Sequence, residues 1–549
     1  MLFGFGMKPR SDTTPRSYWL QHDALKLPAP HHGVLTGPEK TQVAIIGGGI
    51  TGLLSGLLLL RAGKTVTLLD ANQIGANSHS VRSTGHLTEI LDRDFTELVR
   101  RFGVDAMIRF TEAHRMAIHR LGSLIEELEG AGACGWARLP GYLYCEQEHQ
   151  VDDLRAQASL LDQLHIPCAL VKHVPLPFSV AQAIRIENQA QVNPLALIRL
   201  LERTFSKEGG RIYEHSLVKS VRPTTRGVRV ITNHGSLIAE HALITTHTPV
   251  LTGSVVPFQL TPARTYVLAA RVRNAPIMDG LFWDWSDPGH YLRVSEGELL
   301  AGGEDHRTGS QNTIETESLN RLKDYVRSRF ELEQISSSWS GQVLESIDGL
   351  PLVGPSIRSE RILYATGFGG NGISQGAMAA ILMSEQVQGR KEDLMTLLSP
   401  HRLIRPMHLM RWISQNRVYP MNLLRSRILQ PLANALQNQG SLAVDSLARD
   451  EAQVGTLGGR DIAAYRDANG ILHAVSSRCT HLGGELHFNE FEKTWDCNCH
   501  GSRFSIDGEV LEGPAKTALE RISLPQKSPP PETKEKKQEA PDKDTKKAA

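Results

Sequence analysis

The stretch Gln42-Val-Ala-Ile-Ile-Gly-Gly-Gly-Ile-Thr-Gly52 decides how the first part of this chain folds. Its apolar start predicts a buried strand, and the Leu-rich segment after it predicts a helix. Gly47, Gly49 and Gly52 match the pattern G-x-G-x-x-G, in which glycine permits a tight turn and lets a pyrophosphate approach a helix N-terminus. The next short strand ends at Asp70, eighteen positions past Gly52, where a carboxylate can accept both ribose hydroxyls. The segment predicts a dinucleotide site but does not choose between NAD and FAD. A glycine-rich turn without a ligand is the alternative.

Cysteine and histidine recur in two short segments near the other end of the chain. Cys479-Thr480-His481 is followed, sixteen positions on, by Cys497-Asn498-Cys499-His500. Two thiolates on one iron and two neutral imidazoles on the other are the ligands of a Rieske [2Fe–2S] centre. The stretch 471–514, with CTHLGG, WDCNCHGSRF and EGPA in order, resembles a Rieske domain throughout. We predict Cys479, His481, Cys497 and His500 as the metal ligands of one cluster, and a four-ligand zinc site is the alternative.

Four further runs indicate which dinucleotide binds. They are NSHSVRSTGHLTE at 77–89, AEHALITTHTP at 239–249, SIDGLPLVG at 346–354 and YATGFGGNGISQG at 364–376. Together they resemble the D-amino-acid-oxidase-like FAD-dependent oxidoreductase family over about 41–395. Such a flavoprotein followed by a Rieske domain is similar to a bacterial subgroup with this fusion, as are the runs GGEDHRTG at 302–309 and WSGQ at 339–342. The resemblance implies FAD as the cofactor.

The resemblance also implies the fold: an α/β, Rossmann-like FAD-binding domain interleaved with an α+β substrate domain, followed by a small all-β Rieske domain. We expect an N-terminal arm at 1–40 and the oxidoreductase at 41–395. Its FAD-binding parts are expected at about 41–100, 180–255 and 340–395, and its substrate parts at about 101–179 and 256–339. A basic helical connector at 396–440, the Rieske domain at 441–525 and a disordered tail at 526–549, which is rich in Pro, Lys and Glu, complete the chain.

Composition excludes several classes of protein. The 549 residues exceed one hydrophobic core, and a formal charge of +1 gives no global field for nucleic acid or an anionic membrane. Six cysteines in this length do not make a disulfide scaffold. The N-terminus lacks the apolar core of a signal peptide, and the most apolar stretch, Leu53 to Leu60, is too short to span a bilayer. We therefore expect a cytoplasmic protein without a transmembrane segment.

The resemblance carries residue roles onto the FAD site. The ADP part would be held by Gly47, Gly49, Gly52 and Asp70, and the adenine would receive backbone hydrogen bonds at Val218. The segment along the flavin would be Arg82, Ser83 and Thr84. A helix N-terminus at the pyrimidine end of the isoalloxazine would be formed by Gly369, Gly370, Gly372 and Ile373. A positive helix end stabilises the negative charge that develops there on reduction. Gly367-x-Gly369-x-x-Gly372 is a second fingerprint match, but no acidic-ended strand follows it, so we reject a separate NAD domain.

The Rieske segment differs from its high-potential relatives. Where those relatives carry a cysteine, this chain has Gly484, so the bridge to Cys499 cannot form and Cys499 is predicted to be a free thiol. Ser502, which can donate a hydrogen bond to a cluster sulfur, is present, whereas the tyrosine that donates another is Phe504 here. Because fewer donors stabilise the reduced cluster less, we predict a potential in the lower half of the Rieske range of about −150 to +300 mV.

The family oxidises C–N bonds of amines or amino acids, which needs little besides a deprotonated amine and an anchored carboxylate. Arg293 is the predicted carboxylate anchor because a guanidinium grips a carboxylate with two hydrogen bonds, although a strand-surface arginine is equally compatible. Tyr291 and His86 are the other predicted catalytic residues. Tyr266, Trp283, Trp285, Asp305 and His306 are further candidates for the pocket, each with a structural role as the alternative.

A mononuclear iron of the Rieske-oxygenase type is rejected. His114 and His119 lie on a helical pattern about 140° apart by helix periodicity, and the expected upstream carboxylate is missing. The sequence thus predicts a dehydrogenase that oxidises a small amine or amino acid and passes electrons through the cluster to an external acceptor. The alternatives are a reductase, in which the cluster feeds the flavin from an external donor, and a flavoprotein whose cluster is a redox or iron sensor.

Overall fold

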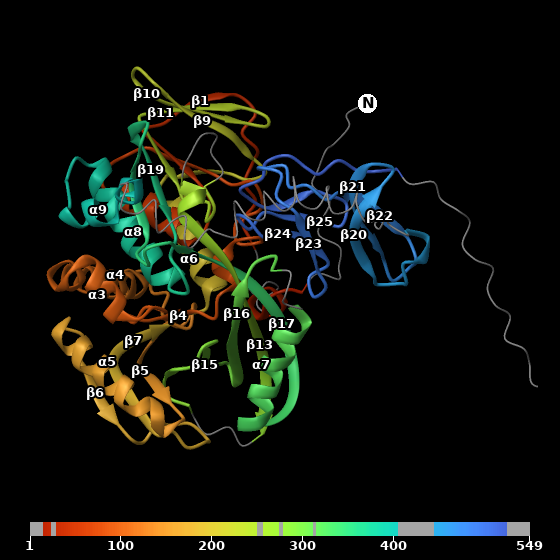
Figure 1. Cartoon of the computed structure of the whole chain (residues 1–549). Coiled ribbons are helices and arrows are strands. Elements are labelled where there is room, and N and C mark those ends of the chain that lie inside the picture. Colours follow the sequence, from red (N-terminus) through yellow and green to blue (C-terminus); the bar gives the residue numbers. More distant parts are fainter. Residues whose placement is uncertain are drawn as a thin grey trace, which may run out of the picture.

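The apolar residues before the glycine loop form β2 (Val43–Ile46), a buried strand inside a six-stranded sheet (Figure 1). The structure is a computed structural model and describes residues 15–22, 29–249, 256–273, 278–310, 315–404 and 444–523. The strand order is β18-β19-β12-β2-β3-β8, and all pairs are parallel except β18 with β19. The other members are β3 (Val66–Leu69), β8 (Arg211–Tyr213), β12 (His241–Ile244), β18 (Leu352–Ser356) and β19 (Ser359–Thr366).

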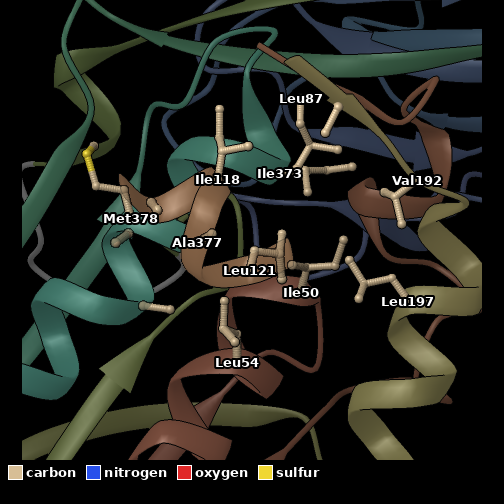
Figure 2. Close-up of a cluster of buried hydrophobic side chains, with 14 of the residues drawn as sticks. Ile50, Leu54, Leu87, Ile118, Leu121, Val192, Leu197, Ile373, Ala377 and Met378 are labelled. Carbon is tan, nitrogen blue, oxygen red and sulfur yellow. The ribbon is translucent and has the colours of Figure 1, made fainter. Parts of the chain in front are cut away.

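Helices pack against this sheet through one apolar core (Figure 2). They are α2 (Ile50–Arg61), α4 (Val104–Glu127), α6 (Pro194–Lys207) and α8 (Gly372–Val387). Ile50 and Leu54 of α2 meet Ile118 of α4 and Ile373 of α8 in this core, and all are buried except for a few per cent of their surface. Because Ile50 and Ile373 lie in the first turns of their helices, this packing holds the N-termini of α2 and α8 close together.

A second, nine-stranded sheet forms the other half of the flavoprotein part. Its path is β17-β13-β16-β15-β14-β5-β7-β4, and β6 pairs with β7. The strands are β4 (His86–Leu87), β5 (Ala137–Cys145), β6 (Cys168–Val171), β7 (Gln182–Gln191), β13 (Leu260–Arg273), β14 (Leu281–Asp284), β15 (His290–Ser295), β16 (Glu298–Arg307) and β17 (Glu331–Ser346). The substrate domain was expected at about 101–179 and 256–339. Strands β4 and β7 and the end of β17 lie outside these ranges but belong to this sheet.

The N-terminal arm is built into the body. Helix α1 (Tyr18–His22) buries Trp19 completely, and the Trp19 indole donates a hydrogen bond to the Ser83 carbonyl. Strand β1 (Pro38–Lys40) adds to a small sheet with β9 (Val218–Thr224), β10 (Gly227–Thr232) and β11 (Ser236–Ala239). The described part of the arm is therefore packed against the flavoprotein.

The C-terminal part is the predicted all-β domain. One sheet contains β20 (Ala452–Leu457), β21 (Arg460–Arg466) and β22 (Leu472–Ser476), and the other β23 (Leu486–Asn489), β24 (Thr494–Cys497), β25 (Arg503–Ser505) and β26 (Val510–Glu512). The turn predicted at Asp467–Gly470 joins β21 to β22, where the Asp467 side chain accepts a hydrogen bond from the Ile471 N–H. Figure 1 shows this domain, in blue, beside the flavoprotein part.

The remaining helices of the described residues are α3 (Phe95–Phe102), α5 (Val151–Gln163), α7 (Glu315–Arg329) and α9 (Asp393–Leu398). Their 3-10 turns are η1 (His79–Arg82), η2 (Glu148–Gln150), η3 (Val256–Gln259), η4 (Pro400–Ile404) and η6 (Val444–Ser446). The predicted connector beyond 404 and the predicted tail beyond 523 lie outside the described residues. In the described ranges, no helix has both the length and the apolar character that crossing a bilayer requires.

Candidate functional site

A cavity of about 1650 Å³ opens at the carboxyl ends of β2, β3 and β12 and at the N-termini of α2 and α8. Ligands of doubly wound sheets bind at this edge. Among the predicted cofactor residues, the cavity is lined by Gly47, Gly49, Asp70, Arg82, Ser83, Thr84, Val218, Gly369, Gly370, Gly372 and Ile373. The fold therefore brings together residues that lie more than 300 positions apart in the sequence.

Gly52, the remaining predicted cofactor residue, lies behind the cavity wall. A Cβ at Gly52 would lie 2.0 Å from the Gly47 carbonyl oxygen, so only glycine lets α2 approach the loop. At Gly47, where φ is +109°, a Cβ would lie 2.7 Å from the Thr245 carbonyl oxygen. The two glycines thus have packing roles, and the close approach that they permit shapes the loop along the cavity.

Asp70 holds the glycine loop from the end of β3. Its carboxylate accepts hydrogen bonds of 2.8 Å from the backbone N–H groups of Gly48 and Asn72. Burial raises the pKa of Asp70 to about 6 despite these two hydrogen bonds. The position at the strand end agrees with the predicted role at a ribose.

The cavity also has polar atoms that the protein leaves unpaired. The rings of His79 and His247 stack with centroids 3.8 Å apart in the cavity wall. Nδ1 of His79, Nε2 of His247 and Nε2 of Gln342 are buried without a hydrogen-bond partner among the described residues. Buried polar atoms are nearly always hydrogen-bonded, so these atoms fit a cavity that holds a large polar ligand.

The predicted residues Tyr291 and His86 line the same cavity, beyond the flavin-side segment. The Tyr291 hydroxyl lies 3.0 Å from the Thr265 hydroxyl. The rings of Tyr291 and His86 meet edge to face, with centroids 5.8 Å apart. His86 Nδ1 lies 2.9 Å from the Thr84 hydroxyl. Burial, and then the charge of Arg293, lower the pKa of His86 to about 3, so its imidazole is neutral at physiological pH.

Trp283, Trp285 and Asp305 also line this end of the cavity. The Asp305 side chain is exposed to the cavity, and desolvation by the surrounding protein raises its pKa to about 7. A carboxyl group with this pKa can hold or release a proton at neutral pH. Tyr266 and His306 do not line the cavity; they are hydrogen-bonded to each other at 3.0 Å behind it.

The placement of Arg293 does not support its predicted role as a carboxylate anchor. Its side chain is 1% exposed and is not part of the cavity wall. The guanidinium donates hydrogen bonds to the carbonyls of Gly85 and Val192 and lies over the Trp19 ring at 5.6 Å. Arg293 lies on the same face of β15 as Tyr291. At Tyr291 this face is open to the cavity, whereas at Arg293 it is covered by the turn at Gly85. Arg293 therefore supports the segment along the flavin.

The four predicted cluster ligands lie in two adjacent pairs. The thiol of Cys479 contacts that of Cys497, and this contact together with burial raises its pKa. The imidazoles of His481 and His500 meet edge to face with centroids 4.8 Å apart. No three His, Cys, Asp or Glu side chains converge on a single metal position in the ranges that the structure covers. A Rieske cluster contains two irons, one held by two cysteines and the other by two histidines, so ligands in these two pairs fit it.

The surroundings of the pairs agree with the sequence. Nδ1 of His481 is buried without a hydrogen-bond partner in the described part of the chain, as a metal-binding nitrogen would be. The Ser502 hydroxyl hydrogen-bonds the thiol of Cys479. A Cβ at Gly484 would lie 2.8 Å from Cys499 Sγ, which places position 484 where a cysteine could bridge to Cys499. In this chain Cys499 is a free cysteine.

The cluster domain closes one side of the flavoprotein cavity. Residues of this domain that line the cavity are Glu509, Val510, Leu511, Glu512, Gly513, Ala515, Lys516 and Ala518. The ring of Phe258, in η3, meets the His500 imidazole edge to face at 5.0 Å. His500 is 6% exposed. The cluster site and the cavity are therefore parts of one packed assembly.

A buried set of charges holds the two parts together. The Glu492 carboxylate, in the turn between β23 and β24, is fully buried and pairs with Arg82 at 3.2 Å and with Arg264 and Arg503. Arg503 also pairs with Glu512 at 2.8 Å. Two of these cations come from the flavoprotein part, so opposite charges face each other across the contact.

Sequence reasoning missed several of these residues. His79 and His247 lie within runs that carried the family resemblance, which was the available signal. Glu492 lies in an Asn-Glu-Phe-Glu-Lys turn that is indistinguishable from a solvated loop. Because its burial depends on a surface of another domain, no local pattern could have revealed it.

Comparison with known proteins gives the family. The model of the FAD dependent oxidoreductase family (DAO) matches residues 42–386, and that of the Rieske [2Fe-2S] domain matches residues 439–524. This chain belongs to the FAD dependent oxidoreductase family and carries a C-terminal Rieske domain. It is therefore an oxidoreductase with FAD and one [2Fe–2S] cluster, and the zinc alternative is wrong. The predicted family, fold class and cofactors are confirmed.

Individual relatives resemble the chain over different parts of its length. The chain is 31% identical over 516 residues to the Rieske 2Fe-2S iron-sulfur protein YhfW of Bacillus subtilis, which covers 93% of this chain and 98% of that protein. It is 24% identical over 377 residues to gamma-glutamylputrescine oxidoreductase of Escherichia coli, which covers 64% of this chain and 84% of that protein. Glycine oxidase from Geobacillus kaustophilus aligns with a TM-score of 0.54 at 20% identity, over 66% of this chain and 99% of that one. The structural likeness at this identity shows the fold alone.

Proposed function

We propose that this protein is a dehydrogenase that oxidises a small amine or amino acid and passes the electrons through the Rieske cluster to an external acceptor. When bound, FAD takes two electrons from the donor, and the cluster transfers electrons one at a time. The proposal includes a cytoplasmic location, because an oxygen-sensitive cluster suits a reducing compartment. The observation that carries the proposal is the cavity wall that the cluster domain supplies.

The chemistry at the substrate end supports a C–N oxidation. Tyr291 and Trp283 provide an apolar wall, and His86 is neutral and held by hydrogen bonds. Asp305, with a pKa of about 7, can accept a proton from an incoming ammonium group, which makes the amine able to give up hydride. Relatives that act on glycine or gamma-glutamylputrescine by name belong to the same broad class of donor.

The test is an anaerobic titration of the holoprotein with a panel of amines and amino acids. Flavin absorbance and the EPR signal of the reduced cluster are followed together. We expect one compound to bleach the flavin first and the cluster signal to grow afterwards. If no donor reduces the flavin, the dehydrogenase proposal fails.

The reductase and sensor alternatives predict different results when flavin absorbance and the cluster EPR signal are followed in this way. In a reductase, a low-potential donor would reduce the cluster first and the flavin after it. In a sensor, removal of the cluster would change the activity of the flavoprotein without any electron exchange between the centres. The packing of the cluster domain against the cavity favours exchange over a distant sensor.

A further inference from the structure

Two sequence runs resemble the Rieske-fused subgroup, 302–309 and 339–342, and besides lining the cavity with Asp305 and Gln342 they contact the cluster domain. Both lead to the cluster-binding loop that joins β24 to β25. Gly309 follows the first run's strand, β16, and a Cβ there would lie 2.8 Å from the Asn498 backbone nitrogen. Gln342, in the second run, lies against Gly501, the residue after the ligand His500. The two runs thus form the surface of the flavoprotein part, here called the seat, against which the loop with the cluster ligand His500 packs.

The seat is closely packed on both sides. A Cβ at Gly501 would lie 2.7 Å from Pro262 Cβ and 2.8 Å from Gln342 Oε1. Gly309 and Gly501 both have positive φ, of +66° and +74°. Such contacts leave no space for a side chain at Gly309 or Gly501, so the loop packs closely against the flavoprotein.

Gln342 lies at the junction between this seat and the flavin cavity. It is 3% exposed and lines the cavity. Its Oε1 accepts a hydrogen bond of 3.3 Å from the Thr308 hydroxyl, whereas its Nε2 is buried without a partner among the described residues. An unpaired buried donor is costly and uncommon in native proteins, which points to an acceptor supplied from within the cavity.

We propose that Gln342 joins the two redox centres: its amide donates a hydrogen bond to the flavin in the cavity, and its side chain seats the cluster-binding loop at Gly501. The proposal rests on the function proposed above and makes Gln342 a positioning residue. Each exchange moves one electron, so the flavin is oxidised by one electron as the cluster iron is reduced. The cluster passes this electron on to the external one-electron acceptor before it takes the second electron from the flavin.

The experiment compares three variants with the wild-type holoprotein. Gln342→Leu removes the amide and keeps the volume. Gly309→Ala adds a Cβ that would lie 2.8 Å from the Asn498 backbone nitrogen, and so displaces the cluster-binding loop without changing Gln342. Gly297→Ala, at the opposite end of β16, is the matched control because Gly297 has a positive φ of +82° and no atom within 4 Å of its Cβ position.

Two quantities are measured without any amine substrate. The first is FAD affinity, from flavin fluorescence during titration of the deflavinated protein. The second is the exchange rate between flavin and cluster after a flash of photoreduced 5-deazariboflavin, followed by the absorbance of both centres. FAD and iron content per chain are checked first, so that only fully loaded protein enters the flash experiment.

We expect Gln342→Leu to weaken FAD binding by roughly 2- to 12-fold, the worth of one net hydrogen bond, and to slow the exchange. Gly309→Ala should slow the exchange, and Gly297→Ala should leave both quantities at the wild-type value. The proposal is overturned if Gln342→Leu leaves either quantity unchanged, or if the wild-type exchange rate rises with protein concentration. Since no amine is used, these results are independent of whether the substrate titration succeeds.

Discussion

Replacing Glu492 by Gln tests whether buried charge holds the cluster domain on the flavoprotein. The Glu492 carboxylate is fully buried between the guanidinium groups of Arg82, Arg264 and Arg503. Glutamine keeps the shape of the side chain but removes the negative charge. Three buried cations would then share fewer counter-charges, so we expect the contact between the domains to weaken.

The magnitude follows from the pKa of this carboxyl. Burial alone would raise the pKa of Glu492, but the guanidinium groups of Arg264, Arg503 and Arg82 lower it from 4.5 to about 2. The difference between a pKa of 4.5 and one of about 2 corresponds to about 3 kcal/mol in favour of the charged carboxylate. Removing one partner of a buried ion pair costs about 3–5 kcal/mol in proteins, so the two values agree.

The sign of the pH dependence follows from the same shift. Because the folded pKa lies below the unfolded value, Glu492 contributes its stabilisation fully above about pH 4.5. The contribution is lost as the pH falls from 4.5 through about 2. The Gln variant has no such group to protonate, so its stability should fall less over this window than that of the wild type.

The assay is urea unfolding, with FAD release followed by fluorescence and the cluster by visible circular dichroism. Glu333→Gln is the control, because Glu333 pairs with Arg273 at 3.2 Å on an exposed strand edge, and such pairs contribute about 0–1 kcal/mol. We expect the Glu492 variant to lose FAD and cluster at clearly lower urea than the control. Midpoints equal to those of Glu333→Gln would refute the reasoning.

Three further predictions concern single residues of the two sites. Gly484→Cys should form a disulfide with Cys499 under oxidising conditions, and closing a loop of about 15 residues should stabilise the Rieske domain by roughly 3 kcal/mol. Counting free thiols by mass spectrometry and comparing urea midpoints with and without reductant checks it, and an unbridged thiol pair contradicts it. In the wild type, the rate of flavin reduction by a donor amine should rise as the pH passes about 7, because the Asp305 carboxyl loses its proton there. Asp305→Asn should abolish this rise. If the variant keeps it, another group is the proton acceptor. Gly52→Ala should cost about 1–3 kcal/mol of stability and lower FAD content, because the new Cβ would lie 2.0 Å from a carbonyl oxygen of the glycine loop. Gly33→Ala, where nothing lies within 4 Å, should match the wild type.

Much of the site could be predicted because its groups are contiguous in the chain. The glycine loop from Gly47 to Gly52 carries its own strand before it and its own helix after it, so its conformation follows from local sequence. The cluster ligands Cys479 and His481 likewise act at a fixed short spacing. The family runs then placed Arg82 and Gly369 at the same cavity, where the structure has them.

The incorrect placement of Arg293 shows what strand alternation cannot predict, namely which segments cover each position of a strand face. Alternation along β15 places Tyr291 and Arg293 on one face, but only the fold decides what covers each position on that face. The cavity lies over Tyr291, whereas the Gly85 turn and Trp19 cover Arg293. A residue's face is a local property, and its neighbours on that face come from distant segments.

The sequence by itself determined the nature of both redox sites, because each is encoded in a short segment whose residue types and spacing the chemistry requires. It also determined the cofactors and the order of the domains. The tertiary structure alone decided how the sites relate: the burial of Glu492, the seat for Gly501 and the position of Gln342 between cluster and cavity. These depend on two surfaces that meet only in the folded chain, since the free energy of a buried charge or an unpaired amide is set by the groups opposite it.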